Sequence, residues 1–283
     1  QMYSAVFSQL QQTGSHQVHE VIGTLSSDNL LYAMSLHDQI PYEYRQALHS
    51  SDKAKTMLLY LLLDEDPSIK AKQLQWMTKQ PSICQDYLQS LTLMSQGLST
   101  RLALPLVELL IPILKTLKAP AKKQILEQVL LMARKDGELS IFESCLYSLL
   151  RMSFEQDKAR TTSHAIKKIQ VVIEDVNHVV SSLIHAAGGS DQNKQVLHAR
   201  MMKVLSKQSA TLLAQEDITT KSLFSSLKKL KHLSPMLKRS LMDVCGDIVL
   251  HDGIVQSTEY ETLRLMSLLM ACPMPAMLID PVA

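Results

Sequence analysis

The sequence is poor in residues that interrupt helices or favour strands. Only 8 of its 283 residues are glycine, and aromatic residues make up 5%. Leucine, methionine, glutamine and lysine, which favour helix, are abundant. No useful stretch alternates apolar and polar residues with β-branched enrichment, as a half-buried strand would. With 46% hydrophobic residues to build a core, the sequence predicts an all-α protein.

Cysteine is scarce, and charge of neither sign dominates. None of the four cysteines belongs to a Cys-x-x-Cys motif, which argues against a zinc ribbon and against a disulfide framework. We expect inert, reduced thiols at Cys84, Cys145, Cys245 and Cys272. The net charge of +2 lacks the strong basic excess typical of nucleic-acid binding. No nucleic-acid partner is predicted.

Long hydrophobic runs are also missing. The longest, "LALPLVELLIPILKTL" at 102–117, contains Glu108 and is interrupted by Pro105 and Pro112. It is too short for a membrane span, so we expect a buried helix whose ends are set by the prolines. The chain begins "QMYSAVFSQL", which does not have the pattern of a signal peptide. We expect a piece excised from a longer protein.

One short pattern occurs twice, as "ARKDGELSIFE" at 133–143 and "VLHDGIVQSTE" at 249–259. Placing 125–150 over 241–266, at an offset of 116, aligns apolar residues. The aligned pairs are Ile125 with Leu241, Val129 with Cys245, Met132 with Ile248, and Leu139 with Val255. Upstream, "LKTLK" at 114–118 matches "LKKLK" at 227–231, and Pro120 and Pro235 follow. Each copy predicts a helix, a proline turn, a helix, an Asp-Gly turn and a helix.

The repeat suggests a division into an N-terminal helical region at 1–98 and two modules at 99–188 and 189–283. The joint between the modules is "AAGGSDQ" at 186–192. There Gly188 and Gly189 should end one helix, and Ser190 or Asp191 should cap the next.

The Asp-Gly turns allow two interpretations. In the structural one, Gly137 and Gly253 adopt the left-handed conformation, and Ser140 forms a capping box with Glu143. In the functional one, the carboxylates bind a divalent cation; these weak candidates are Asp136, Glu143, Asp252 and Glu259. A calcium-binding EF-hand loop would need oxygen ligands where Met132 and Arg134 stand. The structural interpretation is therefore favoured, and no metal site is predicted.

The stretch "HQVHEV" at 16–21 resembles zinc chemistry without completing it. The zinc peptidase motif H-E-x-x-H needs a second histidine one helical turn after the first. Here His19 and Glu20 are present, but Gly23 occupies the position of the second histidine. We interpret His16 and His19 as ordinary surface histidines. No catalytic residue and no cofactor are predicted.

Basic residues gather in two places, one in each predicted module. They are Lys115, Lys118, Lys122 and Lys123, and then Lys221, Lys228, Lys229, Lys231, Lys238 and Arg239. A solvated helix face is the simplest explanation. The alternative is contact with an anionic membrane surface or an acidic partner.

Two family resemblances follow from these stretches. The Asp-Gly turns between helices resemble those of TerB-like domains, the helical domains of tellurite-resistance proteins. The order of "VHEVIGTLSSDNLLYAMSLHDQIP", "ALHSSDKAKTMLLYLLLDED", "RLALPLVELLIPILKTL", "ARKDGELSIFE" and "VLHDGIVQSTEYETLRLMSLLMACPMP" resembles the C-terminal extension of bacterial membrane zinc metallopeptidases of the HtpX/CAAX-protease type.

The resemblance implies a parent protein with membrane helices and a zinc protease domain that lie outside this chain. It implies a soluble region on the cytoplasmic side of the bacterial inner membrane, without catalytic residues of its own. The expected function is regulatory or partner-binding, with the parent protease domain or another protein as partner. The alternatives are a divalent-cation-responsive module acting through its Asp-Gly turns, and a freestanding helical enzyme.

Overall fold

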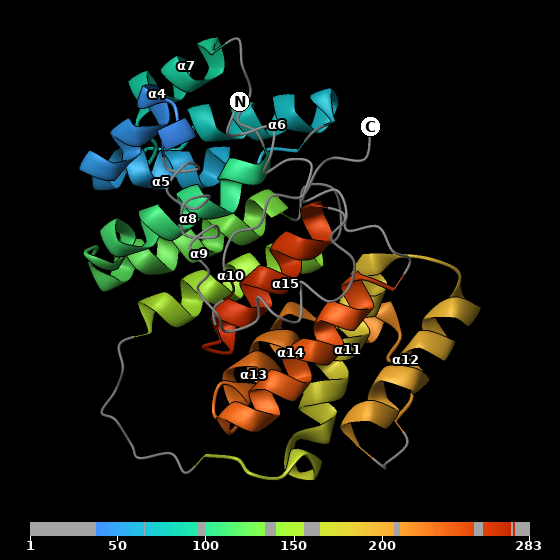
Figure 1. Ribbon diagram of the computed structural model, residues 1–283. Helices are drawn as coiled ribbons and strands as arrows, with labels where there is room; N and C mark the ends of the chain where they lie inside the picture. Colours follow the sequence, from blue (N-terminus) through green and yellow to red (C-terminus); the bar gives the residue numbers. More distant parts are fainter. Residues whose placement is uncertain are drawn as a thin grey trace, which may run out of the picture. The chain divides into compact units, whose positions relative to one another are not determined.

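The computed structural model describes residues 38–64, 66–94, 100–133, 140–155, 165–206, 210–251, 257–272 and 274. These residues are mainly helical and include no β-strand, only an isolated bridge between Ile166 and Leu233 (Figure 1). The predicted all-α fold is confirmed. The chain divides into two compact units, residues 32–159 and residues 160–283 together with 1–31.

The unit at 32–159 is organised around one central helix, α5 (Ser51–Tyr60), which contacts α7, α8 and α9. Ser50 caps α5 by accepting a hydrogen bond from the amide of Lys53. The apolar residues Met57, Leu58 and Leu59 are almost completely buried. Its other elements are α4 (Tyr42–Arg45), η1 (Gln46–His49), α6 (Pro67–Thr78), α7 (Gln85–Leu93), α8 (Thr100–Lys115), α9 (Ala119–Ala133) and α10 (Ile141–Phe154).

In the unit that contains 160–283, α11 (Ile173–Ala187) has the central place. It contacts α12, α13, α14 and α15 and buries Val176, Val179, Val180 and Leu183. The remaining elements are η3 (Ile169–Val172), α12 (Asp191–Leu205), η4 (Gln215–Asp217), α13 (Thr220–Leu230), α14 (Pro235–Val249) and α15 (Ser257–Leu269).

Helix α8 corrects one expectation, because Pro105 and Pro112 lie inside the helix and do not set its ends. An interior proline costs about 3 kcal/mol through a lost hydrogen bond and a clash. The helix nevertheless continues because its apolar face is buried, and each buried Leu or Val contributes about 1.5–3 kcal/mol. The buried residues of that face are Leu102, Leu104, Leu106, Val107, Leu110 and Leu114.

The two units share part of the order of their elements. In each, a short 3-10 turn (η1 or η3) precedes the central helix, and three helices end the unit. Helices α9 and α14 both span 15 residues, and their starts at Ala119 and Pro235 are 116 residues apart. Helices α10 and α15 start at Ile141 and Ser257, at the same offset.

Corresponding helices also make corresponding contacts. Helix α10 packs on α8 and α9, and helix α15 packs on α13 and α14. Three of the four predicted apolar pairs lie in described residues, and both members of each pair are buried: Ile125 with Leu241, Val129 with Cys245, and Met132 with Ile248. The fourth pair, Leu139 with Val255, lies outside the described residues. The matched burial therefore follows the predicted register.

Along the chain, one compact unit ends at residue 159 and the other continues from residue 160. The repeat instead predicted module borders after residues 98 and 188. The repeat marks the last three helices of each unit, but α5 and α11 bury their apolar faces against those helices and so belong with them. The predicted joint at 186–192 lies within the second unit. Its local structure is as predicted: Gly188 and Gly189 have φ values of 75° and 94° after α11, and Ser190 caps α12.

Candidate functional site

The capping box predicted after the first Asp-Gly is present. The Oγ of Ser140 accepts a hydrogen bond from the amide of Glu143 at 3.2 Å, and a carboxylate oxygen of Glu143 accepts one from the amide of Ser140 at 2.8 Å. The Ser140 hydroxyl donates to the same carboxylate oxygen at 2.8 Å. The Glu143 side chain thus satisfies groups at the start of α10. Asp136 and Gly137 lie outside the described residues.

The second copy differs from the first at the matching glutamate. Glu259 lies in the first turn of α15 and is only 4% exposed. Asp252 and Gly253 lie outside the described residues. Helix α15 begins at Ser257, so Ser257 and Thr258 lie within the helix and are not its cap. The two glutamates are therefore held differently, Glu143 in a capping box and Glu259 buried.

These positions bear directly on the cation interpretation. Among the described residues, no three His, Cys, Asp or Glu side chains lie close enough together to hold a metal ion. Glu143 uses its carboxylate within the capping box, which a cation would have to disrupt. His16 and His19 lie outside the described residues.

A buried polar network that the sequence analysis missed links α11 to α12 and to the segment that follows α12. The Nε2 of His198 lies 2.6 Å from the Oδ1 of Asn177, whose Nδ2 donates to the carbonyl of Thr211 at 3.0 Å. One turn further along α11, Ser181 accepts from the amide of Leu213 at 3.2 Å, and His185 Nε2 lies 2.8 Å from the Leu213 carbonyl. Residues 211–213 are thus held by α11 side chains.

The network fixes the state of its histidine. Because the Asn177 amide nitrogen donates to Thr211, its oxygen is the acceptor and His198 must donate from Nε2. Burial lowers the pKa of His198, and the neighbouring His185 lowers it further. A neutral imidazole bonded to an amide holds structure and does not activate a nucleophile. No local motif marks this network, since its members are 21–34 residues apart.

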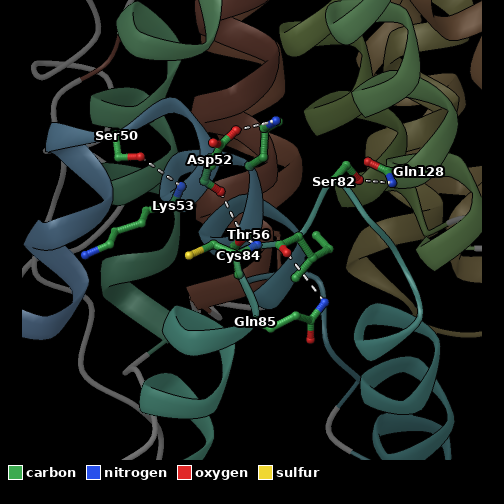
Figure 2. Close-up of polar contacts among 10 residues, drawn as sticks. Ser50, Asp52, Lys53, Thr56, Ser82, Cys84, Gln85 and Gln128 are labelled. Atoms are coloured by element: carbon green, nitrogen blue, oxygen red, sulfur yellow. Dashed lines mark hydrogen bonds and ion pairs between the residues drawn. The ribbon is translucent and has the colours of Figure 1, made fainter.

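Polar side chains also join the elements of the first unit, as Figure 2 shows around α5. Thr56 donates to the carbonyl of Asp52 and accepts from the amide of Cys84 at 2.9 Å, which connects α5 to the start of α7. The Gln128 amide donates to the hydroxyl of Ser82 at 2.8 Å. Gln73 accepts from the amide of Asp64 and donates to the carbonyl of Met132 at the end of α9. These contacts position helices.

The cysteines fall into two groups. Cys145 and Cys245 are fully buried, and desolvation raises the pKa of each thiol to about 12. Burial also raises the pKa of Cys272. A raised pKa favours the thiol over the reactive thiolate, in line with the expectation for these three. Cys84 is half-buried at the N-cap of α7 and so lies at a helix start.

The chain matches no known family model, no curated protein and no solved structure. Among the described residues, no helix is both long and apolar enough to cross a membrane.

Proposed function

We propose that this chain is a non-catalytic, partner-binding region built from two TerB-like helical units. We propose further that it belongs to a membrane-attached zinc metallopeptidase, in line with the resemblance of its ordered stretches to the C-terminal extension of such enzymes. Its partner would be the protease domain of that parent or another protein, on the cytoplasmic side of a bacterial membrane.

The main support is the coincidence of helix bounds at a constant offset. Helices α9 and α14 start and end 116 residues apart, and α10 and α15 start at that same offset. A TerB-like tandem predicts this register on either side of two Asp-Gly turns. An interaction role is supported by two side chains of types that often act in catalysis but that here form structural hydrogen bonds. Glu143 caps a helix, and His198 bonds to Asn177.

A calorimetric titration of the chain with calcium, magnesium and zinc tests this proposal against a divalent-cation module. We expect no saturable binding, because Glu143 is engaged in the capping box and Glu259 is buried. Stoichiometric binding would overturn the proposal if it were lost in a variant with both Asp136→Asn and Asp252→Asn. The conservative change removes the charge of each aspartate and nearly keeps its shape.

A further inference from the structure

A long segment of the second unit has no acidic residue. From 218 to 242 the chain contains six Lys or Arg residues and neither Asp nor Glu. The segment covers α13, the turn after it and the start of α14. Lys228, Lys231 and Arg239 are exposed there, as is Met236, whose side chain is 82% exposed. We name this junction the second basic corner.

The first unit has the same arrangement between α8 and α9. From 109 to 126 the chain contains four lysines and no acidic residue. Lys115 and Lys118 correspond to Lys228 and Lys231 at an offset of 113. Lys122 and Lys123 correspond to Lys238 and Arg239 at an offset of 116. We name this junction the first basic corner.

The exposure of the cations also matches between corresponding positions of the two corners. Lys122 and Lys238 are both half-buried, whereas Lys115, Lys118 and Lys123 and their counterparts Lys228, Lys231 and Arg239 are exposed. The Nζ of Lys122 lies 5.9 Å from the ring centroid of Phe154, and burial lowers the pKa of Lys238. The Nζ of Lys228 likewise lies 5.6 Å from the ring centroid of Phe224, so a cation–ring contact holds one lysine at each corner.

The helix dipoles favour only some of these cations. Lys115 and Lys228 lie in the last turns of α8 and α13, where the negative end of the dipole favours positive charge. Lys123 and Arg239 lie just after the first turns of α9 and α14, where the dipole gives no such stabilisation. Neither helix has an acidic residue in its first turn. Lys123 has only an exposed ion pair with Glu127 at 3.8 Å, and such pairs contribute little. Both corners thus concentrate positive potential at one end of a helix pair.

We propose that the two basic corners are docking surfaces for an anionic phospholipid bilayer. Five of the six exposed cations that correspond between the corners are lysines, which act as point charges and suit a diffuse layer of phosphates, whereas bidentate recognition of a defined carboxylate favours arginine. The exposed Met236 provides an apolar side chain that can enter the headgroup region beside Lys231 and Arg239. This inference rests on the proposed function, since it names one partner of the interaction region.

Sedimentation with vesicles tests the proposal on the full chain. The probes are vesicles of phosphatidylglycerol with phosphatidylcholine, and vesicles of phosphatidylcholine alone. One variant neutralises the corners by replacing six exposed cations with Gln: Lys115, Lys118, Lys123, Lys228, Lys231 and Arg239. The control makes the same change in net charge at six exposed lysines outside the corners: Lys70, Lys72, Lys79, Lys167, Lys168 and Lys203. Two further variants neutralise one corner each.

We expect the unmodified chain to bind only the anionic vesicles, and rising salt to release it. Each cation near such a surface contributes about fivefold in affinity, so the corner variant should bind at least on the order of a hundredfold more weakly. The control should bind within a few fold of the unmodified chain, and each single-corner variant should lie between these limits.

Equal losses in the corner variant and the control would overturn the proposal, because net charge alone would then explain binding. Absence of binding at low salt would also overturn it. If polyglutamate then bound in a corner-dependent way, the surface would be assigned to acidic polypeptides. Failure here leaves the proposed non-catalytic function standing, whereas saturable cation binding at the Asp-Gly turns would remove that function whatever the vesicles show.

Discussion

The backbone conformation of Gly188 determines which residue can occupy the C-cap of α11. The pair Gly188-Gly189 followed by Ser190 indicated a helix end and a new cap, and Gly188 has φ 75° and ψ −156° at the C-cap of α11. That conformation is accessible almost only to glycine. A Cβ at this position would meet no atom within 4 Å, so the requirement comes from the backbone and not from crowding.

Gly188→Ala should therefore lower the free energy of unfolding by about 1–3 kcal/mol, the usual cost of a side chain in this region of backbone conformation. Chemical denaturation monitored by helical circular dichroism measures the change. The exposed Gln195→Ala on α12 is the control and should stay within about 0.5 kcal/mol of the unmodified chain. An unchanged midpoint for Gly188→Ala would contradict the assigned conformation.

The capping box at Ser140 and Glu143 permits a double-mutant cycle. Ser140→Ala should cost about 1 kcal/mol through loss of the N-cap, and Glu143→Ala about 0.5–1 kcal/mol. Because the two side chains bond to each other as well as to the backbone, the double variant should lose less than the sum of the two. Strict additivity in urea denaturation would show that the pair does not act together.

His198 makes the stability of the second unit depend on pH. The unfolded chain binds a proton near pH 6.5, whereas the folded state, with its lowered pKa, resists protonation. Stability is therefore present above about pH 6.5 and is lost as pH falls from there toward the folded pKa.

The variant His198→Gln should flatten this decline, because a glutamine amide can donate to Asn177 without titrating. Thermal melts between about pH 5 and 7.5 measure the effect. The exposed His232→Gln is the control and should keep the slope of the unmodified chain. A slope in His198→Gln that equals that of the unmodified chain would assign the pH dependence to other groups.

Helix α8 shows where local signals give way to packing. Proline usually ends helices, and the sequence analysis placed the helix ends at Pro105 and Pro112 for that reason. The structure continues α8 from Thr100 to Lys115 because the Leu and Val residues of one face reach the core only in a continuous helix. Long-range burial of this kind is not encoded in the residues next to the prolines.

Pro112→Ala should accordingly stabilise the chain. Pro112 is exposed within the helix, so alanine restores a backbone donor without disturbing the core. The gain should be about 1–2 kcal/mol, since part of the roughly 3 kcal/mol helix penalty is offset by the greater entropy of the unfolded chain. Differential scanning calorimetry should show a higher Tm. A lower Tm would mean that the proline ring contributes to packing.

Helix starts with local signals were predicted better than contacts between distant residues. The Ser190 cap, the Ser140 capping box and the start of α14 at Pro235 each follow from a few adjacent residues. By contrast, the network of His198, Asn177 and Thr211 depends on which helices become neighbours, and the sequence contains no signal for it. The counterpart roles of α5 and α11 were missed for the same reason, since their sequences show no evident match.

For the whole molecule, we propose two helical units that act by binding and not by catalysis and that share a central helix and three final helices. A zinc peptidase would need three protein ligands for the metal and an open position for water. The sequence lacks the second histidine of H-E-x-x-H after His19 and Glu20. Without a bound metal, nothing in that motif lowers the pKa of water toward neutrality.

The most direct test is elemental analysis of the full chain purified without chelator, combined with a casein digestion assay on the same sample. The account predicts substoichiometric zinc and no cleavage, both unchanged in His16→Ala and His19→Ala. Stoichiometric zinc together with proteolysis that either substitution abolishes would contradict it, because the chain would then carry a catalytic centre of its own.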